Sequence, residues 1–203
     1  MAGKARPVYP PPADFAKREI PVASEKPFAL YRLFPGGFDP IYYSRSDENR
    51  YSASRSPCGA LYGGADLETC LMEIYGDRIY GFRQGNEQVV LPDADWRTRR
   101  AALLSIPPVK LCDFTQRKTL QACGVDAASL LSPDLAVPQA WGAAVMDHPL
   151  RFDGIRFTSR FTHGVCVALF DRVTGVEVSC DIGPIAKLPE GDRILDRFKV
   201  ALV

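Results

Sequence analysis

The sequence lacks any apolar run close to the ~20 residues that a helix needs to cross a bilayer. It also lacks an excess of one charge, because 25 Lys and Arg stand against 24 Asp and Glu. A net charge of +1 creates no field that would gather nucleic acid or anionic lipid. Residues 1–22 lack the continuous apolar core of a signal peptide. We therefore expect a cytoplasmic protein with no membrane and no direct nucleic-acid partner.

Histidine is scarce, and cysteine does not occur in closely spaced pairs. The two histidines are His148 and His163, and none of the six cysteines forms a C-x-x-C pair. Zinc sites use such ligands at short spacings, so we expect neither a metal site nor a resident cofactor. Cys70, Cys166 and Cys180 stand in apolar or strand-like contexts, which predicts small buried side chains.

The composition is that of an ordinary globular protein, with 203 residues of which 46% are hydrophobic and 24% charged. Residues 1–27 are rich in proline, which predicts an extended arm that is either disordered or wrapped on the surface. Residues 28–203 are predicted to form a single domain.

Hydrophobic periodicity predicts short strands mixed with short helices, without regular alternation of the two. The predicted strands cover residues 28–34, 60–62, 79–82, 88–91, 109–114, 153–159, 165–170 and 176–181. The predicted helices are a short one that carries Glu73 and segments at 93–104, 119–124, 126–131 and 136–148, and the tail from Leu188 is weakly patterned. This mixture favours an α+β fold with a compact mixed sheet as its core.

The stretch from Arg50 to Gly76 contains the most informative local pattern. Asp66 is predicted to cap the helix that follows, because its side chain can accept the free N–H groups of the first turn. A four-residue apolar stripe marks the buried face of this helix: Leu67, Cys70, Leu71 and Ile74. Glu73 lies to one side of that stripe, where a carboxylate either faces a cleft or is simply solvated.

Three separated features share an order along the chain. They are Tyr31-Arg32, the segment from Tyr62 to Glu73, and residues 154–159 before an apolar strand that ends in Phe170. This order resembles the RES-domain family, toxins of bacterial toxin–antitoxin pairs that degrade NAD⁺. The resemblance covers roughly residues 28–171 and implies a fold similar to that of ADP-ribosyltransferase toxins.

The resemblance also implies roles for individual residues. Arg32, Glu73 and Ser159 correspond to the arginine, glutamate and serine of the family name and are the expected catalytic residues. The expected substrate-binding residues are Tyr62, Arg50, Tyr31, Arg160 and His163. Tyr51-Ser52 follows Arg50 where many members have tryptophan and asparagine, so the sequence departs from the family pattern there.

These residue types suit the breakage of the nicotinamide–ribose bond. A carboxylate such as Glu73 would stabilise the positive charge that develops on the ribose. The planar forks of Arg32 and Arg50 match pyrophosphate oxygens. Tyr62 offers a flat face to a ring, and the Ser159 hydroxyl can donate to a phosphate or a ribose hydroxyl. Each of these side chains also has an ordinary structural alternative in an ion pair, a core or a strand end.

The acceptor of the ribosyl group stays open, because phosphate, water and a protein side chain share the same first half of the reaction. The basic residues between Arg45 and Arg55 favour phosphate slightly. The resemblance implies NAD⁺ as the substrate and an antitoxin protein as a partner that blocks the site, with an oligomer of the two possible. A mono-ADP-ribosyltransferase and a non-catalytic nucleotide-binding module are the alternatives.

Overall fold

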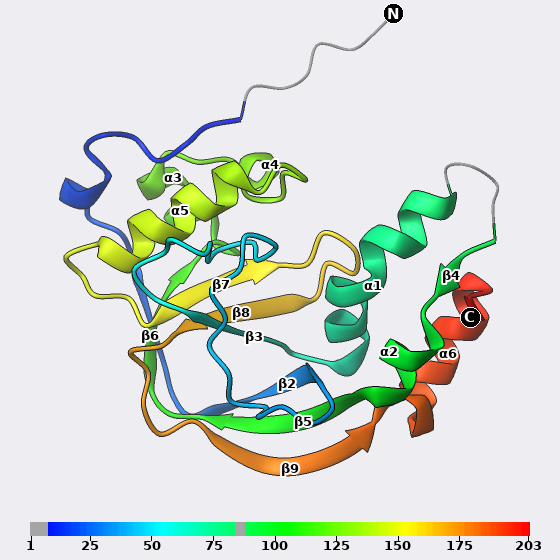
Figure 1. The fold of residues 1–203 in the computed structure, drawn as a ribbon. Coiled ribbons are helices and arrows are strands. Elements are labelled where there is room, and N and C mark those ends of the chain that lie inside the picture. Colours follow the sequence, from blue (N-terminus) through cyan, green and yellow to red (C-terminus); the bar gives the residue numbers. More distant parts are fainter. Residues whose placement is uncertain (1–7, 84–87) are drawn as a thin grey trace, which may run out of the picture.

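A computed structural model describes residues 8–83 and 88–203, and within them most strands join one sheet (Figure 1). That sheet has eight strands among the described residues, in the order β1-β6-β7-β8-β3-β2-β5-β9. The bounds are β1 Val22–Glu25, β6 Val109–Asp113, β7 Gly154–Thr158, β8 Val165–Phe170, β3 Ala60–Gly64, β2 Phe28–Pro35, β5 Arg99–Ile106 and β9 Glu177–Pro184. Strands β6 and β7 pair in parallel and the other neighbours are antiparallel.

The helices gather in two groups around this sheet (Figure 1). Those near β7 and β8 are α3 Arg117–Cys123, α4 Ala127–Leu130 and α5 Ala136–Asp147. Those at the other end are α1 Leu67–Arg83, α2 Asp93–Thr98 and α6 Pro189–Phe198. Short 3₁₀ turns occur at Phe15–Lys17 and Ile185–Lys187, and β4 Val90–Leu91 pairs in parallel with β10 Ala201–Leu202. The prediction of an α+β fold with a mixed sheet is confirmed.

Strand β8 lies between two apolar layers, which explains its continuous hydrophobic sequence. Cys166, Ala168 and Phe170 pack in the cluster that includes Trp141 of α5. Val167 and Leu169 point to the other face and pack with residues of β2, β3, β5 and β6. A strand buried on both faces has no polar side to alternate with, so its sequence reads as an apolar run.

Helix α1 begins as the sequence predicts and runs further than expected. The Thr69 N–H donates to Asp66 Oδ1 at 2.7 Å, which confirms the predicted cap. The buried face of the helix continues through Leu71, Met72, Tyr75 and Ile79, a helical spacing that includes the start of the strand predicted at 79–82. The strand prediction there is therefore wrong. Ile74, predicted to be buried, is 37% exposed.

Other sequence predictions are wrong where a short hydrophobic pattern fits both a helix and a strand. The segment 93–104 is helical only to Thr98, because Arg99–Ile106 pairs along its length with β2. The weakly patterned tail contains α6, whose Pro189 stands at the helix start. Cys180 is exposed on β9, whereas Cys70 and Cys166 are buried as predicted.

Residues 8–25 lie along the domain beside α3 and α5 (Figure 1). Phe15 is 4% exposed and meets Trp141 edge-on, with ring centroids 5.2 Å apart. Trp141 Nε1 donates to the Tyr9 carbonyl at 2.8 Å, and β1 pairs with β6 at one edge of the sheet. Of the two sequence alternatives for the arm, the described part is wrapped on the domain. No helix in the described ranges is long and apolar enough to span a bilayer.

We predict that Phe15→Ala lowers the free energy of unfolding by about 3–5 kcal/mol, because it empties a packed site against Trp141. Urea denaturation followed by circular dichroism measures the change. Phe38→Ala is the matched control, because Phe38 is 67% exposed and its loss should change stability by less than about 0.5 kcal/mol. Equal effects of the two substitutions would show that Phe15 is not part of the core.

Candidate functional site

A cavity of about 330 Å³ opens between α1, strands β2 and β3, and the loop that precedes β3. This volume lies at the small end of the range for ligand pockets, about 300–1,000 Å³. The lining contains charged and polar side chains together with apolar ones. It comprises Arg32, Leu33, Glu48, Asn49, Arg50, Tyr62, Gly63, Gly64, Cys70, Glu73, Ile74, Asp77, Pro133, Leu135, Phe157, Arg160, Phe161 and Cys166.

The Glu73 carboxylate is held by a hydroxyl from a distant part of the chain. Ser159 Oγ donates to Glu73 Oε1 at 2.7 Å, and Ser159 is fully buried. The same Oγ accepts the N–H groups of Phe161 at 3.2 Å and Thr162 at 3.4 Å. A hydroxyl has one proton to donate, so those two contacts leave it directed at Glu73. The bond fixes the orientation of the carboxylate at the cavity.

The backbone after β7 explains why Ser159 points inward. The Ser159 N–H donates to the Gly164 carbonyl at 2.8 Å, and the His163 N–H donates to the Ser159 carbonyl at 3.1 Å. The chain therefore makes a tight turn here, with a φ of 60° at His163. The turn places Arg160 and Phe161 in the cavity wall and leaves His163 exposed, outside the lining.

Arg32 presents a positive charge to the cavity. Its Nη1 donates to the Tyr62 carbonyl at 2.7 Å and its Nη2 to the Tyr42 carbonyl at 3.4 Å, while its buried Nε has no partner. Within residues 8–83 and 88–203, no carboxylate forms an ion pair with it. Burial lowers the pKa of Arg32 to about 10, so the group is still charged at neutral pH.

Tyr62 supports the loop that forms the opposite wall. Its hydroxyl oxygen accepts the Tyr51 N–H at 2.9 Å, and burial raises the pKa of this phenol above its usual value. The phenol therefore keeps its proton at neutral pH. The strand predicted at residues 60–62 is present and extends to Gly64 as β3. A Cβ on Gly64 would lie 2.8 Å from Cys70 Sγ, so the glycine lets α1 pack closely on this strand.

Arg50 and Arg160 line the cavity through different attachments. Arg50 Nη1 donates to the carbonyls of Leu130 at 3.2 Å and Ser132 at 3.0 Å. Arg160 forms an ion pair with the exposed Asp77, and its guanidinium lies 4.6 Å from the ring centroid of Phe161. An ion pair with an exposed partner contributes about 0–1 kcal/mol, so Arg160 can exchange Asp77 for an anionic ligand at small cost.

The structure thus brings together most of the residues selected from the sequence. Arg32, Arg50, Tyr62, Glu73 and Arg160 line the cavity, and Ser159 contacts Glu73. Tyr31 and His163 are not among the lining residues. The thiol of Cys70 donates a hydrogen bond to the backbone carbonyl of Tyr31 at 3.2 Å.

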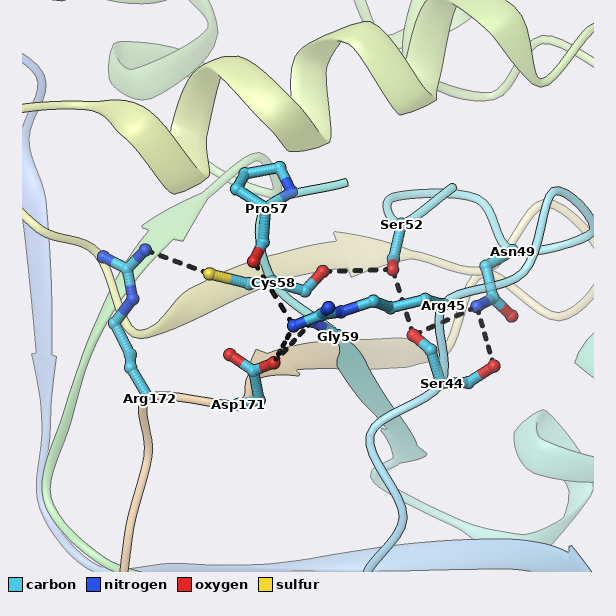
Figure 2. A network of polar contacts seen from close by, with 9 residues as sticks. All are labelled: Ser44, Arg45, Asn49, Ser52, Pro57, Cys58, Gly59, Asp171 and Arg172. Carbon is cyan, nitrogen blue, oxygen red and sulfur yellow. Dashed lines mark hydrogen bonds and ion pairs between the residues drawn. The ribbon is translucent and has the colours of Figure 1, made fainter. Parts of the chain in front are cut away.

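The basic residues of the segment from Arg45 to Arg55 do not all face the cavity. Arg45 pairs with Asp171 at 3.0 Å and donates to the Pro57 carbonyl at 3.3 Å (Figure 2). It is not among the residues that line the cavity. Asp171 also accepts the Gly59 N–H at 2.7 Å. Arg45 therefore fastens the base of this loop, whereas Arg50 of the same basic segment lines the cavity.

Sequence reasoning missed several lining residues. Asp77 follows Glu73 by four positions, and that helical spacing alone places both on one face of α1. Phe157, Asn49, Pro133 and Leu135 carry no such local signal, because only tertiary packing brings them to the cavity. Across the described part of the chain, no three His, Cys, Asp or Glu side chains cluster in a way that could hold a metal ion.

Comparisons with known proteins show the family and the fold of this chain. The family model described as the RES domain matches residues 29–188. Among solved structures, a chain of the M. tuberculosis MbcT–MbcA toxin–antitoxin complex is similar, with a TM-score of 0.59 and 15% sequence identity. The similarity covers 80% of this chain and 86% of that one. No curated protein sequence matches significantly.

We predict that Tyr62→Phe lowers the free energy of unfolding by about 1–3 kcal/mol, because the Tyr51 N–H loses its acceptor inside the protein. Chemical denaturation measures this change. Tyr42→Phe serves as the control, because Tyr42 is 59% exposed. Unchanged stability of Tyr62→Phe would mean that the bond to Tyr51 is replaced by water at no cost.

Proposed function

The chain belongs to the RES-domain family, and from this premise we propose that it is the toxin of a toxin–antitoxin pair and cleaves the nicotinamide–ribose bond of NAD⁺. The observation that carries the proposal is a carboxylate, Glu73, held by Ser159 in a cavity that Arg32 also lines. A fixed carboxylate and an arginine without a carboxylate partner suit a substrate that becomes cationic at one carbon and is anionic at its pyrophosphate.

Glu73 is the group that would act on the ribose. Bond cleavage builds positive charge on the ribose carbon, and a carboxylate already oriented near it stabilises that charge without reorganisation. Ser159 is fully buried and its proton goes to Glu73, so its proposed role is to hold that carboxylate. This differs from the direct contact with phosphate or ribose that the sequence suggested.

The arginines would bind the anionic part of the substrate. Arg32 retains an unpartnered Nε–H, and Arg50 uses only Nη1 in its contacts with backbone carbonyls. The remaining N–H groups of Arg50 would bind phosphate oxygens in the paired geometry that guanidinium favours, and Arg32 would contribute its positive charge. Tyr62 would place its ring against the nicotinamide. Nicotinamide leaves as a neutral molecule, so the reaction needs no strong general acid.

The proposed partner is an antitoxin that covers this cavity. A solved structure with a similar fold comes from a toxin–antitoxin complex. In the present chain, the cavity wall includes exposed side chains that a partner could contact, among them Glu48 and Asp77. A protein bound over these residues would prevent NAD⁺ from entering.

We predict that the purified protein releases nicotinamide from NAD⁺. Chromatography of the products, with and without inorganic phosphate, identifies the acceptor: ADP-ribose 1″-phosphate indicates phosphorolysis and ADP-ribose indicates hydrolysis. Nicotinamide that appears only when a protein substrate is added, with label on that polypeptide, would identify a mono-ADP-ribosyltransferase instead. The absence of release under all three conditions would refute the proposed reaction.

We predict that Glu73→Gln slows nicotinamide release at least ~100-fold, because the amide keeps the shape of the side chain but not its charge. Glu68→Gln is the matched control on the same helix, since Glu68 pairs with Arg197 and lies outside the cavity lining. Initial rates at saturating NAD⁺ measure both. A rate for Glu73→Gln close to that of the control would rule out the proposed role of the carboxylate.

A further inference from the structure

One wall of the cavity has no regular secondary structure to hold it. Glu48, Asn49 and Arg50 lie in the long connection between β2 and β3, and all three line the cavity. A loop keeps such side chains in place only if its backbone is bonded to rigid elements. The contacts that hold residues 47–51 therefore decide how well Arg50 is placed.

Gln139 of α5 provides the most direct of these contacts. Its Nε2 donates to the carbonyl oxygens of Asp47 and Asn49, each at 2.8 Å. These two carbonyls flank Glu48. An amide has two N–H bonds on its nitrogen, so one side chain satisfies both acceptors. The amide oxygen of Gln139 could not bond to either backbone carbonyl, because both are acceptors. The contacts therefore determine the orientation of the Gln139 amide.

Helix α5 is close enough to act as a rigid support. A Cβ built on Gly142 would lie 2.1 Å from the Tyr51 carbonyl oxygen, so the helix backbone touches this loop directly. On the other side, Asn49 Nδ2 donates to Ser44 Oγ at 3.1 Å and Ser52 Oγ to the Ser44 carbonyl at 3.0 Å (Figure 2). The loop is thus closed on itself, and Gln139 ties it to α5.

We propose that Gln139 is a positioning residue for substrate binding: it holds the backbone of residues 47–49 so that Arg50 faces the cavity. The inference rests on the proposed function, in which Arg50 binds the pyrophosphate of NAD⁺. Gln139 lies outside the cavity lining, so its proposed role is exerted through the loop and not by contact with the substrate. Its loss should therefore weaken NAD⁺ binding while the chemical step, which depends on Glu73, continues.

The test is Gln139→Glu, which preserves the size of the side chain and turns an oxygen toward two carbonyl oxygens. We expect KM for NAD⁺ to rise about tenfold, which corresponds to about 1.4 kcal/mol of lost binding, with kcat within about threefold of the wild type. Gln121→Glu on α3 is the matched control, because Gln121 is exposed and outside the cavity lining. A fall in kcat with unchanged KM would overturn the inference.

A double-mutant cycle separates positioning from general destabilisation. If Gln139 acts through Arg50, Gln139→Glu should raise KM little further in a protein that already carries Arg50→Ala. Full additivity of the two effects would contradict the inference. Thermal unfolding of each variant checks that the fold is intact at the assay temperature.

Amide hydrogen exchange tests the same contact without turnover. Gln139→Glu should accelerate exchange at residues 47–51 relative to the wild type and to Gln121→Glu. Unchanged protection would refute the positioning role even in an active enzyme. Accelerated exchange in a protein that does not cleave NAD⁺ would support the loop contact and refute the proposed function instead.

Discussion

The hydrogen bond between Ser159 and Glu73 is the constraint on which the candidate site depends. It joins a residue just after β7 to a residue of α1, 86 positions away in the sequence. A glutamate on a helix surface ordinarily samples several rotamers, and a buried hydroxyl that donates at 2.7 Å selects one of them. The cavity thereby acquires a carboxylate whose orientation exists before any ligand arrives.

The positively charged groups of the site are arginines, and most of them bond to backbone carbonyls and not to carboxylates. Arg32 bonds to backbone carbonyls, and so does Arg50. Carbonyl partners orient a guanidinium without neutralising it, so these side chains stay available to an anion. Arg160 differs, because its guanidinium forms an ion pair with the exposed carboxylate of Asp77. The site thus combines the fixed negative charge of Glu73 with the positive charges of Arg32 and Arg50, which no carboxylate neutralises within the described residues. This is the combination that the proposed substrate requires.

Support for this arrangement comes from both helical groups. Helix α1 carries Glu73 and packs closely on β3 because Gly64 has no side chain. Helix α5 touches the loop that carries Arg50 and bonds to it through Gln139. The segment 8–25, with Phe15 against Trp141, packs on α5 from outside. Residues far from the cavity therefore contribute to its shape through packing.

The sequence by itself determined the features that arise from local physics. These are the α+β class, the Asp66 cap of α1 and the buried strand β8. The selection of Arg32, Glu73 and Ser159 came instead from the resemblance of their order along the chain to a known family. Tertiary structure alone decided the helix–strand boundary after Thr98, the use of Arg45 in fastening the loop, and the contact of Gln139 with that loop. The reason is physical: caps and periodicities act within a few residues. A hydrogen bond across 86 or 90 positions exists only after the sheet has brought its two ends together.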